Sequence, residues 1–316
     1  MFSLESYISA VKEKGISMDA VMVIQDDVIL ALHRFTDNVF HNVFSVAKSY
    51  TATAIGFAIE EGRLSLSDKP VDLFSNILPE NPDPRWQDVT LFHLLTMTSG
   101  HGKPHMMAVD RKKLRGQTEE QMDPAMMKEW LLFAFTRPMM YQPGEKFSYG
   151  NLAPYVAGRM LEKAVGCSIC DYLYEKMWEP MGTEKPRWDA DLSGHTFAAS
   201  DLYLDIADMA KLGQLYVAGG VYKGRRYLSE EWVKAATSMQ ISSAPINPTG
   251  YGKDEEAGYG YYFWQNQKTG TFRAYGREGQ FVIMIPEKRA VIVTQAMHSN
   301  VQQVLDEVWE HILPQL

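Results

Sequence analysis

Cysteine and long apolar runs are both scarce in this sequence. Two cysteines among 316 residues exclude the disulfide framework on which small secreted domains depend. Every apolar run falls short of the roughly 18 residues that a membrane-spanning helix needs, and the N-terminal segment lacks the cationic and apolar regions of a signal peptide. We therefore expect a cytoplasmic protein that does not associate with a membrane.

The sequence also has fewer basic residues than acidic ones. The chain has 31 lysines and arginines against 39 aspartates and glutamates, which gives a net charge of −8, and it contains no dense basic block. Such a protein has no long-range attraction for a phosphate backbone, so we expect no nucleic-acid partner. The 46% hydrophobic and 22% charged content is typical of a globular protein with a substantial core.

The sequence also lacks a complete set of metal ligands. Cys167 and Cys170 have the spacing of half a zinc site, but the chain has no second cysteine pair to complete four ligands. We expect both to be small core residues. His101 and His105 are four residues apart, yet a glycine and a proline between them interrupt the helix that would align them. We therefore expect neither a metal ion nor a cofactor.

Segments with strand character lie at both ends of the chain. Residues 20–35 contain two runs rich in valine, isoleucine and leucine, which predict a β-hairpin, and three further strand-like stretches lie between residues 258 and 298. The middle is mostly helical, with capping residues, proline and glycine at the ends of its helices. We predict an α+β fold in which helices flank an antiparallel sheet built from both chain ends. The predicted boundaries are 1–62 with 250–316 for the sheet domain and 63–249 for an inserted, mostly helical region.

A serine and a lysine share one face of an apolar helix. The stretch NVFSVAKSYTATAIGFAIEEG, residues 42–62, places Ser45 one turn before Lys48. A serine hydroxyl needs a base to become a good nucleophile, and burial favours the uncharged amine that can act as that base. The alternative is a capping serine beside a lysine that extends to the surface. The same spacing recurs at Ser9 and Lys12, where a polar, amphipathic segment lets the lysine stay solvated.

A second polar pair is found at Tyr149 and Asn151. It follows a Pro-Gly turn and precedes a helix, so both side chains are expected to project from a loop. A tyrosine beside a lysine can relay protons, and an asparagine amide can hold both a lysine and a substrate carbonyl. Asn151 can also serve as the cap of the following helix.

Two glycines interrupt a strand pattern near the C-terminus, in FRAYGREGQFVIMIPE. Gly276 and Gly279 suggest that something approaches the backbone closely, and a substrate is one candidate. Backbone N–H groups at this point, with the N–H of Ser45, would form an oxyanion hole. A simple β-bulge is the alternative.

Taken in order, several motifs resemble the serine β-lactamase and penicillin-binding protein superfamily. They are FSVAKS, LLTMTSG, YQPGEKFSYGN, GRMLEKAVG, MWEPMG, AYGREGQ and IPEKRAVIVTQ. The resemblance is greatest to the class C β-lactamase-like branch, which includes esterases, D-amino-acid peptidases and nylon-oligomer hydrolases. It implies Ser45 as the acylated nucleophile, Lys48 as its proton partner and Tyr149 as the base that also activates water. Asn151 would orient Lys48 and the substrate.

The third motif departs from the family pattern, which has Lys-Thr-Gly or His-x-Gly. One register places Ala274, Tyr275 and Gly276 there, with Arg277 supplying the oxyanion N–H; the other places Arg277, Glu278 and Gly279 there. We prefer the first. The usual cation is then missing, although the side chain of Arg273 or Arg277 could replace it.

The resemblance therefore favours a serine hydrolase that acts on a small ester or amide through an acyl-enzyme, without a cofactor. A β-lactamase or D,D-peptidase acting on a lactam or peptide is the alternative with the same chemistry. A non-catalytic sensor on the same fold is the alternative from another class. The sequence does not predict the oligomeric state, or whether residues 242–258, which are expected to form an exposed loop, close over the site as a lid.

Overall fold

The computed structural model describes residues 2–102, 129–244 and 252–316. The chain divides into two compact units, and helix α2 (Val46–Glu60) begins in the first and continues into the second. Unit 1 consists of residues 1–50, 174–187 and 200–316, and unit 2 consists of residues 51–173 and 188–199. His105 and residues 245–251 of the expected loop lie outside the described residues.

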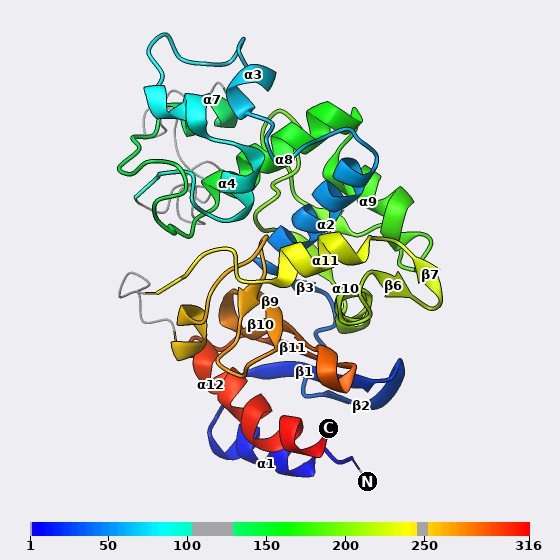
Figure 1. Cartoon of the computed structure of the whole chain (residues 1–316). Helices are drawn as coiled ribbons and strands as arrows, with labels where there is room; N and C mark the ends of the chain where they lie inside the picture. Colours follow the sequence, from blue (N-terminus) through cyan, green and yellow to red (C-terminus); the bar gives the residue numbers. More distant parts are fainter. Residues whose placement is uncertain (1, 103–128, 245–251) are drawn as a thin grey trace. The chain divides into compact units, whose positions relative to one another are not determined.

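The core of unit 1 is a six-stranded antiparallel sheet (Figure 1). Its order is β2-β1-β11-β10-β9-β8, so β1 from the N-terminal hairpin lies between its hairpin partner and the last strand of the chain. The strands are β1 (Met18–Gln25), β2 (Val28–Arg34), β8 (Trp264–Gln265), β9 (Phe272–Gly276), β10 (Gln280–Ile285) and β11 (Ala290–Ala296). The predicted α+β fold with a sheet built from both chain ends is confirmed.

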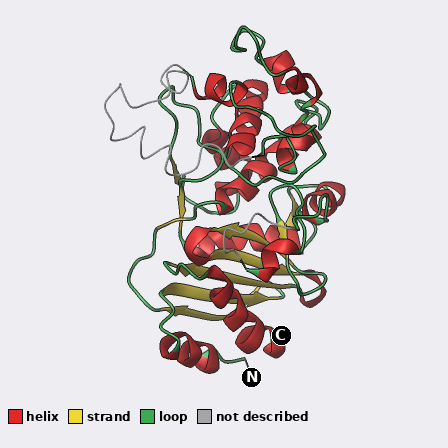
Figure 2. Cartoon of the chain, turned by 90° about the vertical axis from the view of Figure 1, so that its left-hand side faces the viewer, coloured by secondary structure: helices red, strands yellow, loops and turns green. Residues whose placement is uncertain are grey.

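Helices cover both faces of this sheet (Figure 2). Every residue of β10 and β11 is buried, and this is why these strands read as continuous runs of valine and isoleucine rather than as alternating patterns. The helices of unit 1 are α1 (Glu5–Glu13), α10 (Ile206–Val217), α11 (Glu230–Thr237) and α12 (Val301–Glu307), and α12 continues into the π-helical turn η7 (Val308–Ile312) and the 3₁₀ turn η8 (Leu313–Gln315).

Helix α10 packs on the sheet, although the sequence analysis assigns it to the inserted region. Asp205 starts the helix by accepting a 2.8 Å hydrogen bond from the Ala207 N–H. A Cβ on Gly213 would overlap the side chains of Val291 and Val282 on β11 and β10, so the glycine lets the helix approach the strands closely. Its mostly apolar sequence matches this sheet-facing position, and the compact units therefore differ from the predicted boundaries.

The remaining short elements of unit 1 shape its loops. Strand β3 (His41–Asn42) pairs with β5 (Leu202–Leu204), and β6 (Val221–Tyr222) pairs with β7 (Arg225–Arg226). The other short helical turns are η3 (Tyr174–Trp178), η4 (Lys253–Glu256), η5 (Arg277–Gly279) and η6 (Pro286–Lys288). Strand β4 (Arg187–Trp188) lies at the boundary between the two units.

Unit 2 is helical and has an aromatic core. The helices among its described residues are α3 (Pro70–Leu73), α4 (Leu91–Leu95), α7 (Trp130–Phe135), α8 (Leu152–Val165) and α9 (Ile169–Leu173), with the 3₁₀ turn η1 (Pro84–Asp88). The rings of Trp130, Tyr155 and Phe197 contact one another, with centroids 5.7 to 6.3 Å apart. The buried Arg159 bonds Glu129 at 2.5 Å beside them.

The expected burial of the two cysteines is wrong. Helix α8 ends at Gly166, which adopts the left-handed conformation (φ 80°), and Cys167 follows in the exposed connection to α9. Cys170 is partly exposed. By contrast, His101 is buried and packs against Trp86 with ring centroids 5.2 Å apart.

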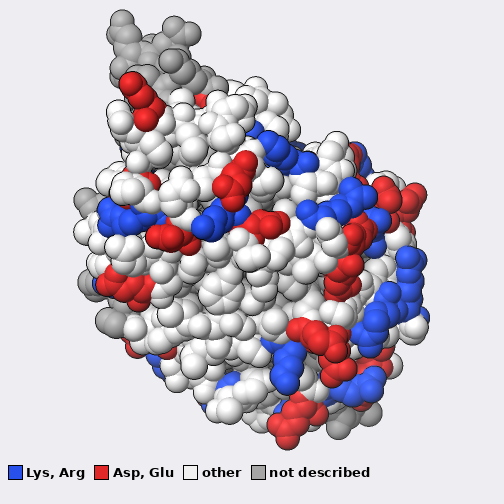
Figure 3. Space-filling model, turned by 45° about the horizontal axis from the view of Figure 1, so that its top comes forward, with Lys and Arg blue, Asp and Glu red and all other residues white. Residues whose placement is uncertain are grey.

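Acidic and basic side chains are interspersed on the face drawn in Figure 3. Among the described residues, no helix has both the length and the apolar character needed to cross a bilayer.

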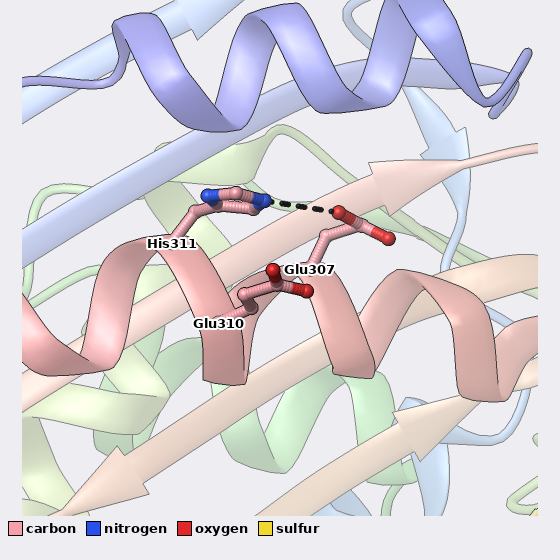
Figure 4. Close-up of side chains that lie close together, drawn as sticks. All are labelled: Glu307, Glu310 and His311. Carbon is pink, nitrogen blue, oxygen red and sulfur yellow. Dashed lines mark ion pairs between the residues drawn. The ribbon is translucent and has the colours of Figure 1, made fainter.

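A buried carboxylate ties the two ends of the chain together. Glu307 is 1% exposed, and its Oε1 accepts a 2.6 Å hydrogen bond from the Lys14 ammonium, just beyond α1. His311 lies one turn further along the C-terminal helix, with its Nε2 3.4 Å from Glu307 Oε2, and Glu310 lies nearby (Figure 4). This group thus links the N-terminal and C-terminal helical segments across the outside of the sheet.

Candidate active site

The side chains of Ser45 and Lys48 are hydrogen-bonded. Lys48 Nζ donates to Ser45 Oγ over 2.8 Å, and Lys48 is 1% exposed. The lysine therefore does not extend to the surface. Ser9 and Lys12, which have the same spacing, are both exposed on α1.

The first turn of α2 is fixed to unit 1 on several sides. Ala47, Ser49 and Tyr50 are fully buried. Ser49 Oγ donates a 2.7 Å bond to the Tyr262 carbonyl, and the Tyr50 hydroxyl donates a 3.2 Å bond to the Asp208 carbonyl. Burial raises the pKa of Tyr50 well above its ordinary value, so this hydroxyl stays protonated. These anchors hold the helix start in a single orientation.

The segment before Ser45 makes a tight, strained turn. The Val43 N–H donates a 2.8 Å bond to the Leu202 carbonyl, which extends the β3–β5 pairing by one residue. Phe44 then adopts a left-handed conformation with φ 47°, which is uncommon for a bulky residue. The chain reverses direction there, and the N–H groups of Val46, Ala47 and Lys48 donate to the carbonyls three residues earlier.

Strand β9 ends beside this turn. A Cβ on Gly276 would overlap the carbonyl oxygen of Val43, so the close neighbour of the glycine is the backbone that leads to Ser45. Gly276 pairs with Gln280 in the β9–β10 register, and residues 277–279 form the hairpin turn η5. The two positive-φ residues of this turn are Glu278 (66°) and Gly279 (94°).

The two arginines considered for the missing cation have different surroundings. Arg273 is fully buried, and its Nη1 donates to the Gln265 carbonyl at 2.7 Å and to the Asn266 side chain. The side chain of Arg277 is 56% exposed, and its guanidinium lies 4.8 Å from the ring centroid of Phe44. Of these two cations, Arg277 is the one next to the serine-bearing turn.

Tyr149 and Asn151 lie in unit 2. The loop that carries them is held by the motif LLTMTSG, because the Thr98 and Met97 carbonyls accept 2.8 Å bonds from Gly144 and Ser148. Tyr149 is partly exposed. Asn151 is buried and occupies the position before α8, but its side chain makes no capping hydrogen bond.

Sequence reasoning missed Asn42 and Asp201. The Asn42 side chain bonds both Asp201 and the Phe44 N–H at 2.8 Å. The two residues are 159 positions apart, and neither stands in a recognisable motif. Nothing in the sequence indicates the strained conformation of Phe44 either, since phenylalanine is not a residue that marks left-handed turns.

An antiparallel sheet built from both chain ends, with a serine hydrogen-bonded to a buried lysine at a helix start, is the arrangement that the resemblance implies for β-lactamase-like proteins. Residues 4–311 match the family model described as Beta-lactamase. The chain therefore belongs to the beta-lactamase family of hydrolases.

Known relatives extend over most of the chain. The 6-aminohexanoate-dimer hydrolase of Paenarthrobacter ureafaciens is 23% identical over 287 residues, which cover 87% of this chain and 71% of that protein. A Bacillus anthracis structure described provisionally as a 6-aminohexanoate-dimer hydrolase has a TM-score of 0.78 at 20% identity, covering 97% of this chain and 82% of that one. The octameric penicillin-binding protein homologue from Pyrococcus abyssi has a TM-score of 0.76 at 22% identity, covering 99% and 77%. At these identities the structural likeness establishes the fold.

Proposed function

We propose that this protein is a serine hydrolase that cleaves a small ester or amide through an acyl-enzyme on Ser45. The observation that carries the proposal is the 2.8 Å bond between Lys48 Nζ and Ser45 Oγ, made by a lysine that is 1% exposed. Burial disfavours the charged ammonium, and the positive end of the α2 dipole disfavours it further. A neutral amine has N–H groups that can donate to the hydroxyl oxygen, as here, and a lone pair that can accept the hydroxyl proton and so activate the oxygen.

The reaction runs in two steps. Ser45 Oγ attacks the substrate carbonyl carbon while its proton passes to Lys48, and the proton then moves to the leaving alcohol or amine as its bond to that carbon breaks. Water then passes a proton to Tyr149 while the Tyr149 hydroxyl passes its own proton to the neutral Lys48, and the water oxygen attacks the acyl carbon. The bond from that carbon to Ser45 Oγ breaks, and Lys48 returns its extra proton to Ser45 Oγ. The acid product is released. Asn151 orients Lys48 and the substrate carbonyl. The order of the motifs along the chain, rather than a measured distance, supports the roles of Tyr149 and Asn151.

The backbone N–H groups of Ser45 and Arg277 form the oxyanion hole in this proposal. The close approach of Gly276 to the Val43 carbonyl and of the Arg277 side chain to the Phe44 ring supports it, because both bring the end of β9 to the serine-bearing turn. Each such donor is typically worth about 3 kcal/mol of transition-state stabilisation.

An amide or ester is favoured over a lactam. The relative from Paenarthrobacter ureafaciens is named as a hydrolase of the 6-aminohexanoate dimer, and the third motif here lacks the lysine or histidine of lactam-binding members. The second candidate is a β-lactamase or D,D-peptidase. Arg277 favours it, because an exposed guanidinium beside the serine-bearing turn can pair with a substrate carboxylate.

Intact-mass measurement tests the nucleophile and the substrate class together. The protein is exposed to a fluorophosphonate and, separately, to penicillin. We expect one fluorophosphonate adduct, lost in Ser45→Ala and retained in Ser9→Ala, which removes the exposed serine of the other S-x-x-K sequence. Ser45→Ala should also abolish p-nitrophenyl acetate hydrolysis. Parental turnover by Ser45→Ala would refute the proposal, and rapid nitrocefin turnover would favour the second candidate.

A further inference from the structure

Several residues other than glycine adopt the left-handed conformation around the turn that carries Ser45, and two of them are connected by one side chain. Phe44 has φ 47° and Asp201 has φ 60°. This conformation is strained for Phe44 and persists only where surrounding contacts enforce it, whereas an aspartate such as Asp201 adopts it more readily. Both residues belong to unit 1, on the two chain segments that contain β3 and β5.

One side chain bridges these two residues. Asn42 Oδ1 accepts a 2.8 Å bond from the Phe44 N–H, and Asn42 Nδ2 donates a 2.8 Å bond to Asp201 Oδ1. Asn42 pairs with Tyr203 in the β3–β5 register, and the Val43 N–H bonds the Leu202 carbonyl at 2.8 Å. Asp201 is buried, so its carboxylate is a fixed anchor for the amide.

We propose that Asn42 and Asp201 are positioning residues that hold the Phe44 turn and thereby set the direction of the Ser45 hydroxyl. The inference rests on the proposed function of Ser45 as the nucleophile. The amide fixes the Phe44 N–H, and the turn at Phe44 fixes where the next residue starts. Without that bond, Phe44 can relax toward an ordinary conformation, which rotates Ser45 relative to Lys48.

The same turn carries the other backbone groups of the proposed site. The Val43 carbonyl touches the Gly276 position, and the Phe44 ring supports the Arg277 guanidinium. A relaxed turn therefore disturbs the nucleophile and the oxyanion hole together. A displacement of about 1 Å at a reacting group can lower the rate about 100-fold.

A reciprocal exchange of the two side chains tests the bridge. Asn42→Asp keeps an acceptor for the Phe44 N–H but replaces the donor to Asp201 with a second carboxylate oxygen, so the two side chains repel each other. Asp201→Asn alone keeps an acceptor for Asn42, and asparagine tolerates the left-handed conformation. In the double variant Asn42→Asp/Asp201→Asn, the new amide donates to the new carboxylate, and the bridge is restored with its polarity reversed.

The readouts are the rate of fluorophosphonate labelling at Ser45, kcat and KM for p-nitrophenyl acetate, and the thermal midpoint. We expect Asn42→Asp to lower the labelling rate and kcat by roughly 10- to 100-fold while KM changes little, because the proposed mechanism gives Asn42 no role in binding the ester. The double variant should recover to within about threefold of the parent. Asn300→Asp is the matched control, because Asn300 also accepts a backbone N–H bond through its side chain, from Gln303 at the start of α12; its labelling should equal that of the parent.

Each outcome decides between defined possibilities. Folded Asn42→Asp protein that labels at the parental rate overturns the positioning role and leaves the proposed function intact. A double variant that regains its thermal midpoint but not its labelling rate also overturns it, because restoring the bridge would then restore only stability. A parent protein that is not labelled at Ser45 removes the proposed function, and the positioning role falls with it.

Discussion

At the scale of single residues, two arginines four positions apart behave very differently. Arg273 points into the core, and burial lowers its pKa despite the opposing influence of Asp254, Glu255 and Tyr275. Arg277 begins the turn after β9 and keeps 56% of its side chain exposed. Of the two, Arg277 is the one that a substrate could meet if Ser45 is the nucleophile as proposed.

Arg277→Ala should affect the turnover of neutral and anionic substrates differently. Turnover of p-nitrophenyl acetate should change by less than about threefold, because the proposed oxyanion donor is the backbone N–H, which alanine retains. An ester that carries a carboxylate should lose about tenfold in kcat/KM, the equivalent of roughly 1.4 kcal/mol for a charge-assisted hydrogen bond. Steady-state kinetics with a matched pair of esters measures the difference. Equal losses for both esters would show that the side chain does not select charge.

Arg289→Ala is the appropriate control for that measurement. Arg289 is also an exposed arginine at a sheet turn, where it pairs with Asp26 at 2.8 Å. Its removal should leave both esters unaffected.

Glu255 should make stability depend on pH. Burial raises its pKa from 4.5 to about 7, opposed by nearby Arg273 and by a hydrogen bond from Tyr275. The native state therefore binds more protons than the unfolded state between those values, so stability falls as pH rises from about 4.5 to 7. The penalty is complete above pH 7, absent below pH 4.5, and on the order of 3 kcal/mol.

Glu255→Gln should remove this penalty. We expect the variant to melt several degrees above the parent at pH 8 and close to it at pH 4.5, as measured by thermal denaturation. Glu256→Gln, which changes the exposed neighbouring carboxylate, should follow the parent at both pH values. A variant that is less stable than the parent at pH 8 would mean that Glu255 is held charged by its partners.

At the scale of elements, β9 and the start of α2 approach each other at one glycine. Gly276→Ala should destabilise the protein and slow Ser45 labelling at least tenfold, because the added methyl overlaps the Val43 carbonyl and displaces the turn. Gly276 has φ −122°, which any residue adopts. The effect of the substitution therefore comes from the contact with the Val43 carbonyl and not from backbone strain. Thermal denaturation and fluorophosphonate labelling measure the two consequences.

Gly182→Ala provides the contrast. Gly182 adopts φ 71° with no atom within 4 Å of an added Cβ, so alanine there should cost about 1 kcal/mol of stability without slowing the labelling. Labelling that slows equally in both variants would attribute the effect to general destabilisation.

The sequence predicts those elements whose evidence is local. The hairpin of β1 and β2 follows from its apolar runs, and the Ser45–Lys48 pairing follows from helical spacing over three residues. Strands β3 and β5 contain only two and three residues, too few to establish a period. The Asn42–Asp201 bridge depends on tertiary pairing, which no local pattern records.

Long-range packing, which the sequence does not reveal, also determines that α10 belongs to unit 1. Its composition is that of any buried helix, and the small residue that lets it approach the strands, Gly213, reads in sequence only as a weak point in a helix. The sequence does not predict the burial of Arg273 either. Its hydrogen-bond partners, Gln265 and Asn266, lie on the preceding segment and are uncharged, so no pair of opposite charges marks the contact.

At the scale of the molecule, the two termini are joined through Glu307. Lys14→Met removes the 2.6 Å partner of a carboxylate whose side chain is 2% exposed, and we expect the thermal midpoint to fall by several degrees because a buried charge loses its compensation. Lys12→Met, a change at an exposed lysine of α1, should have little effect.

A double-mutant cycle separates this pair from its surroundings. Glu307→Gln should make the protein much less sensitive to Lys14→Met, since the charge that needed compensation is gone. Effects of the two changes that simply add would show that Lys14 and Glu307 are not coupled.

The turn before Ser45 is completed by segments that are made at very different times. Residues 42–48 leave the ribosome early, whereas Asp201 and Leu202 come much later, and Gly276 comes later still. A nascent or prematurely terminated polypeptide therefore contains the serine and the lysine without the later backbone segments that orient them. If Ser45 is the nucleophile as proposed, its reactivity toward acylating compounds should accordingly begin only after Gly276 has been synthesised, so that shorter products do not become trapped as dead-end esters.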